Sequence, residues 1–203
     1  MSEAVQKLKK ADRTRRALLD AALQVIGQKG FSSATVDEIV RKAGVSKGVA
    51  YYHFKSKDEM ASSILDQEFA LLQNEFLDLV AREQSPQAVL MGMLDVFASR
   101  LYNHKDLAQL LSTEMWRSNR AWSDGVRESA QALIDVIATQ LKQGQQAGQV
   151  RKDLDPTFSA ASIVGMVVVD AMYCINGAKK PLFTREEFIA RIYDFVHHAI
   201  AVA

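Results

Sequence analysis

Apolar residues recur at helical rather than strand spacing along most of this 203-residue chain. In the first such segment, Leu18, Ala21, Ala22, Val25 and Ile26 fall on one face of a helix. Strand-like alternation never extends beyond a few residues, and no internal repeat is detectable. The pattern therefore predicts an all-α protein with about nine helices.

Local capping signals predict where these helices begin. "TVDE" at 35–38, "SKDE" at 56–59 and "TREE" at 184–187 have the form of a capping box. Ser85-Pro86 and Asp155-Pro156 place proline at the first position of a helix, where its missing N–H costs nothing. The expected helices span about 12–28, 36–43, 47–52, 57–82, 86–102, 105–117, 123–146, 156–175 and 185–202.

Charge divides the chain into two regions. Residues 1–57 hold 12 Lys/Arg and 5 Asp/Glu, whereas residues 58–203 hold 13 and 19. A basic head on an acidic body suggests that the head binds a polyanion. We therefore expect a DNA-binding domain over 1–56 and a larger helical domain over 57–203.

Composition indicates the compartment. The single cysteine fits a reducing cytoplasm, and the N-terminus lacks the apolar core of a secretory signal. The longest apolar run, 156–169, is shorter than the roughly 20 residues needed to span a bilayer. We expect a cytoplasmic protein without a membrane partner.

Residues 35–53 have the lengths of a helix-turn-helix, with "AGV" as the turn. In that motif the second helix enters the DNA major groove with its N-terminal residues nearest the base edges. Lys47 would bind guanine or phosphate, Gly48 would permit close backbone approach, and Val49 and Ala50 would contact thymine methyls. The candidate DNA-contacting set is completed by Ser46 as the helix cap, and by Thr35, Tyr51, Tyr52, His53 and Lys57 as phosphate ligands. The same lengths also suit a helical subdomain that never contacts DNA, but the basic charge favours DNA.

Residues 12–60 resemble the DNA-binding domain of the TetR family of bacterial transcriptional regulators. The match runs from Gly30-Phe31 through "TVDEIVRKAGVSKG" to "YYHFKSK". The resemblance implies a helical homodimer with one DNA-binding head per subunit and a ligand-binding body. By position it places Thr35, Tyr51, Tyr52, His53 and Lys57 at the DNA backbone, and Lys47, Gly48 and Val49 at the bases. Many members have threonine and leucine where this chain has Val49 and Ala50, so their operator preference does not transfer.

The body carries two further expectations. Broad apolar stripes on the helices near 156–175 and 185–202 suggest a dimer interface, the place that the resemblance also implies. A mixture of Met, aromatic and polar side chains suggests a pocket for a small organic effector. Its candidate lining is Phe97, Tyr102, Trp116, Asp170, Met172 and Tyr173. Asp170 interrupts an apolar run, so either a neighbour such as Arg117 or Arg120 satisfies it, or the effector does.

The sequence thus predicts a one-component transcriptional regulator, a repressor released from a palindromic operator by a small molecule. The alternative is a DNA-binding protein that has no effector or is regulated by a protein partner. A helical enzyme is disfavoured, because no phosphate-binding glycine loop, triad or metal-ligand spacing is present. The four histidines, His53, His104, His197 and His198, do not suggest a metal site, and no cofactor is expected.

Overall fold

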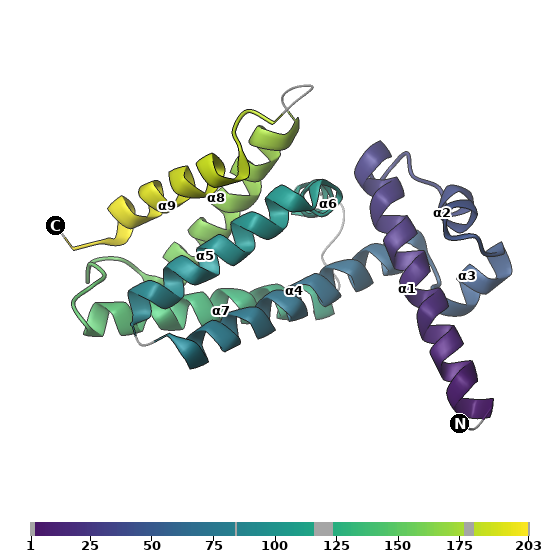
Figure 1. The fold of residues 1–203 in the computed structure, drawn as a ribbon, viewed down its shortest axis with the longest axis horizontal. Coiled ribbons are helices and arrows are strands. Elements are labelled where there is room, and N and C mark those ends of the chain that lie inside the picture. The colour runs from purple at the N-terminus through teal and green to yellow at the C-terminus, as the bar shows by residue number, and fades with distance from the viewer. Residues whose placement is uncertain (1–2, 84, 116–123, 177–180, 203) are drawn as a thin grey trace.

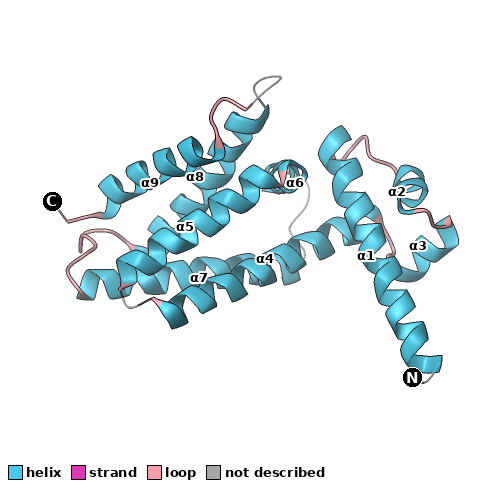
Figure 2. Ribbon diagram, in the orientation of Figure 1, coloured by secondary structure: helices cyan, strands magenta, loops and turns pink. Residues whose placement is uncertain are grey.

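A computed structural model describes residues 3–83, 85–115, 124–176 and 181–202, and those residues form nine helices without a named strand (Figures 1 and 2). The helices are α1 (Glu3–Lys29), α2 (Val36–Ala43), α3 (Lys47–His53), α4 (Lys57–Arg82), α5 (Pro86–Asn103), α6 (Lys105–Met115), α7 (Asp124–Gln146), α8 (Pro156–Asn176) and α9 (Arg185–Ile200). The all-α prediction is confirmed.

Helices α1 to α3 form a small head, and α4 runs from the head into the body (Figure 1). In the head, Leu18, Ile26, Ile39 and Phe54 are almost fully buried. In the body, α4 and α5 pack against α7, while α8 packs on α7 and α9 packs on α5. The head and body also meet directly, because α6 lies against α1.

Most predicted caps are present. Thr35 and Thr184 each form a complete capping box with the glutamate three residues later. Ser85 accepts a hydrogen bond from the Ala88 N–H, and Asp155 accepts one from the Phe158 N–H. These bonds satisfy N–H groups that have no partner within the helix.

Two local predictions were wrong. Ser56 caps α4, but the Glu59 carboxylate accepts from the Lys55 N–H rather than from the Ser56 N–H, so "SKDE" is not a complete box. Helix α1 begins at Glu3 instead of near residue 12. Its first residues are good helix formers without an apolar stripe, so periodicity could not detect them.

Helix α8 has a mixed character. Its segment Pro156–Cys174 is long and apolar enough to cross a membrane by length and composition alone, as the core helices of soluble proteins also can be. Ala160, Val167 and Ala171 are buried, whereas Phe158, Val169 and Tyr173 are exposed. The helix therefore packs on one side and presents an apolar stripe on the other.

Candidate DNA interface and effector cavities

The turn between α2 and α3 depends on Gly44, which ends α2 with a φ of 69°. Residues with a Cβ atom rarely adopt this left-handed conformation. Ser46 then caps α3 by accepting a hydrogen bond from the Val49 N–H at 3.3 Å. This arrangement fixes the start of the recognition helix relative to α2.

Helix α3 presents much of its surface to solvent. Tyr52 is 82% exposed, Tyr51 is 50% exposed and Val49 is 39% exposed. A Cβ atom added to Gly48 would meet nothing within 4 Å, so the backbone there is open to a ligand. The His53 ring packs edge-on against Tyr52, with their centroids 5.1 Å apart.

Ala50 does not belong to this exposed face. It is fully buried, so the expected contact between Ala50 and a thymine methyl is wrong. Ala50 instead packs into the hydrophobic core of the head. The apolar base contact remains a prediction for Val49 alone.

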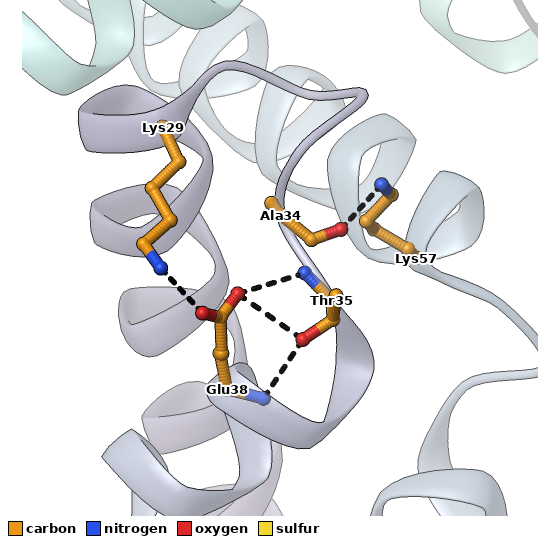
Figure 3. Close-up of polar contacts among 5 residues, drawn as sticks. All are labelled: Lys29, Ala34, Thr35, Glu38 and Lys57. Atoms are coloured by element: carbon orange, nitrogen blue, oxygen red, sulfur yellow. Dashed lines mark hydrogen bonds and ion pairs between the residues drawn. The ribbon is translucent and has the colours of Figure 1, made fainter.

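Thr35 lies at the start of α2 in a compact polar cluster (Figure 3). The Glu38 carboxylate accepts hydrogen bonds from the Thr35 N–H and hydroxyl and forms an ion pair with Lys29. The Lys29 ammonium, followed by the Thr35 N–H, lowers the pKa of Glu38 to about 2. Thr35 is exposed at the start of α2, so a phosphate contact by it remains a prediction.

Lys57 has a structural role that the sequence did not reveal. Its ammonium donates a hydrogen bond to the Ala34 carbonyl at 2.6 Å (Figure 3). It also donates one to the Phe31 carbonyl. The same ammonium lies 4.3 Å from the centre of the Phe31 ring. Lys57 therefore ties the loop between α1 and α2 to the start of α4, and a phosphate contact would have to be shared with these bonds.

Lys47, at the start of α3, forms an ion pair with Asp37 of α2, with Nζ 2.8 Å from Oδ1. This partner was missed from the sequence. Because the two residues lie on different helices, their contact depends on the angle of the turn.

The expected effector residues do not line one cavity. Phe97 lines a cavity of about 160 Å³ between α4, α5, α6, α7 and α8, the interior cavity, whose rim at Ala161 is exposed. Asp170 and Tyr173 instead line a larger groove of about 610 Å³ between α8 and α9. Met172 packs beside the core, and Trp116, Arg117 and Arg120 lie outside the described residues.

Tyr102 has a structural contact of its own. Its hydroxyl donates a hydrogen bond to the Phe183 carbonyl at 2.7 Å, and its ring packs against Phe188. It thereby anchors the segment before α9 to α5.

The interior cavity and the groove differ in chemistry. The interior cavity is lined by side chains without charge: Phe69, Phe97, Leu111, Ala130, Leu133, Ile134, Ala161, Val164, Gly165 and Val168. The groove includes Asp170 and Arg191, and burial raises the pKa of the Asp170 carboxyl. No group of three or more His, Cys, Asp or Glu residues within the described ranges is placed to hold a metal ion.

The outer face of α8 and α9 carries several large apolar side chains. Phe195 is 65% exposed, and Phe158, Val169 and Tyr173 are also exposed. Contiguous apolar patches on a soluble protein usually mark an interaction site. The core of the single chain therefore buries only part of the apolar stripes predicted on these helices.

The geometry of the head defines a DNA-binding regulator of the helix-turn-helix class, and comparisons with known proteins agree. Residues 18–64 match the family model of bacterial regulatory proteins of the tetR family, and residues 86–174 match that of a tetracyclin repressor-like C-terminal domain. The chain belongs to the TetR family of bacterial transcriptional regulators.

Individual relatives extend the match over most of the chain. The transcriptional regulator SrpR of Pseudomonas putida is 29% identical over 77% of this chain and 73% of its own. The A-factor receptor protein of Streptomyces griseus is 33% identical over 76% of this chain, which spans 52% of that relative. The regulator FadR of Bacillus subtilis, solved in complex with stearoyl-CoA, superposes with a TM-score of 0.79 at 19% identity, covering 89% of this chain and 96% of its own.

Proposed function

We propose that this protein is a one-component repressor that binds a palindromic operator as a homodimer and is released by a small organic effector. The observation that carries the proposal is the exposed face of α3, which presents Lys47, Val49 and Tyr52 on a basic head. Operator DNA implies that it acts in the cytoplasm, and we propose no catalytic role.

The proposed dimer uses the outer face of α8 and α9. A two-fold axis through this face would cover Phe158, Val169, Tyr173 and Phe195 with the same side chains of a second copy. It would also present two heads to half-sites about one helical turn apart, roughly 34–36 Å.

The proposed effector is largely apolar and enters the interior cavity at Phe97. A second apolar space of only about 20 Å³ also borders Phe97 from the side of α9, so an elongated apolar group would have to displace side chains to extend past this ring. The complex of FadR with stearoyl-CoA supports a ligand with an apolar chain. Asp170 remains a candidate polar ligand from the neighbouring groove.

The effector can release DNA only if it binds one head arrangement more tightly than the other. The cavity is suited to this coupling because α4 lines it through Phe69 and continues into the head. A change in the position of α4 would therefore move the two recognition helices relative to each other.

The test begins with selection of an operator from random DNA and measurement of its affinity by fluorescence anisotropy. A series from butyryl-CoA to stearoyl-CoA is then added, with coenzyme A alone as the control. We expect release by acyl chains that fill the cavity and no release by coenzyme A. Failure to select any DNA sequence would contradict the regulatory function, whereas operator binding without release would contradict only the effector class.

A matched pair of variants locates the effector. Val164→Phe fills part of the interior cavity and should abolish release while operator affinity is retained. Leu71→Phe changes an exposed residue of α4 and should leave both properties unchanged. If the effector releases both variants from the operator equally well, it binds outside this cavity.

A further inference from the structure

The ion pair between Asp37 and Lys47 lies where the head would meet DNA. Asp37 is the second residue of α2 and Lys47 is the first residue of α3. Their side chains are 70% and 53% exposed, so both are accessible to a bound duplex. A carboxylate at this position is unexpected, because it repels the phosphates that attract the rest of the basic head.

A carboxylate in the first turn of α2 favours the helix dipole, but the ion pair with Lys47 itself adds little to stability. Ion pairs between exposed side chains contribute little to folding, since water screens them and both side chains lose freedom. The neighbouring Glu38 differs, because it completes the cap of α2 and binds Lys29. Asp37 makes its ion pair with the recognition helix itself.

We propose that Asp37 is a positioning residue for DNA recognition, holding Lys47 so that its ammonium contacts base edges rather than phosphates. An unrestrained lysine has a flexible four-carbon stem and pairs with any nearby phosphate. When one N–H of the ammonium binds Asp37, the other two can still donate to guanine O6 or N7. The negative charge of Asp37 meanwhile weakens the attraction between the ammonium and nearby phosphates. Asp37 would thus reduce overall DNA affinity and increase the preference for the operator.

The protonation state of Lys47 agrees with this role. The hydrogen bond to Asp37 raises the pKa of the Lys47 ammonium, so it stays a charged donor throughout the physiological range. The ammonium can serve as a donor here, because both guanine acceptors in the major groove lack protons.

The inference rests on the proposed operator binding, and Asp37→Asn tests it because the amide keeps the shape and removes the charge. Binding to the selected operator and to random duplex is measured at several salt concentrations. We expect tighter binding to random duplex, a salt slope steeper by about one phosphate contact, and an operator preference lower by about fivefold or more. Repeating the selection should give a weaker base preference at the positions that Lys47 reads.

Three control variants isolate the pair. Asp20→Asn removes an exposed carboxylate from α1 and changes the net charge equally, so it reports the long-range effect alone. Asp37→Glu retains the charge and should retain the operator preference. In a Lys47→Ala background, Asp37→Asn should change the salt slope no more than Asp20→Asn does and should leave the selected sequence unchanged.

Several outcomes would overturn the inference. If Asp37→Asn behaves like Asp20→Asn, only net charge matters. If Asp37→Asn alters the selected sequence as much in the Lys47→Ala background as in the wild type, Asp37 itself contacts the DNA. A wild-type protein that selects no DNA sequence would instead refute operator binding, which keeps the two failures distinguishable.

Discussion

Gly27 of α1 and Asp106 of α6 lie in direct backbone contact at the junction of head and body. A Cβ atom added to Gly27 would lie 2.6 Å from the Asp106 Cα, closer than real Cβ atoms approach a neighbour. Because the obstructing atom belongs to the backbone, a side-chain rotation cannot relieve the clash. The close approach of α1 and α6 therefore requires glycine at position 27.

Gly27→Ala should lower the free energy of unfolding by about 1–3 kcal/mol, the usual cost of overpacking. In an open helix position the same change would stabilise the protein, because alanine has the higher helix propensity. Gly48→Ala is the control, since an added Cβ there meets nothing within 4 Å. Urea unfolding compares the two variants, and a stable Gly27→Ala protein would show that α6 moves aside without cost.

Tyr52→Phe should weaken binding to operator and random duplex alike, because the loss of an exposed hydroxyl removes a phosphate contact. Base preference should not change. Tyr193→Phe, on an exposed tyrosine of the body, is the control. Anisotropy titrations with both duplexes measure the effect, and unchanged affinities would remove Tyr52 from the interface.

Lys57→Ala should differ from Tyr52→Phe in one respect. It leaves the carbonyls of Phe31 and Ala34 without this donor, so thermal stability should fall together with DNA affinity. A variant with reduced affinity and an unchanged melting temperature would show that phosphate binding is its main role.

Phe195→Glu should convert the dimer into a folded monomer. The side chain is exposed in the single chain, so a carboxylate there costs little until a second copy covers it. Leu71→Glu alters an exposed apolar residue on α4 and should leave the dimer intact. Sedimentation measures both proteins, and an intact Phe195→Glu dimer would place the interface on another face.

Asp170→Asn should raise stability near neutral pH. Burial raises the pKa of this carboxyl, so its contribution is fully present below the ordinary pKa of 3.8 and is lost as pH rises through the raised value. The variant should therefore match wild type in acid and exceed it at pH 7. Thermal melts across this range measure the difference, and a less stable variant at neutral pH would indicate a structural partner for the charged form.

The lowered pKa of Glu38 predicts the opposite pH dependence for the stability of the head. Its pKa is lowered to about 2, so the stabilisation is present above the ordinary value of 4.5 and is lost as pH falls toward 2. Glu38→Gln should remove this dependence, and Lys29→Met should remove part of it. Acid titration followed by circular dichroism checks the prediction, and an unchanged transition in Glu38→Gln would contradict it.

The sequence predicted helix ends well because caps are local. Thr184 and the glutamate three residues later need only each other, and Ser85 needs only the Ala88 N–H in the same first turn. The first nine residues of α1 were missed because intrinsic propensity without an apolar stripe leaves no periodic signal.

The sites were predicted less completely, because side-chain direction depends on how helices are rotated about their axes. Val49 and Ala50 are neighbours in sequence, yet one is exposed and the other fully buried. Phe97 and Asp170 were grouped because both side chains suit a ligand pocket. They line different cavities, which are bordered by different residues of α8. The ion pair between Asp37 and Lys47 required the turn geometry, which no residue pattern specifies.

Helix α4 belongs to both regions of the protein. Its first turn holds the loop of the head through Lys57, and the match to the N-terminal family model continues to residue 64, inside this helix. A peptide ending at residue 56 would lose Met60, Ala61 and Ile64, which are buried. We therefore expect the head and body to melt as one cooperative unit, and hydrogen exchange in the recognition helix to change when a cavity in the body is filled.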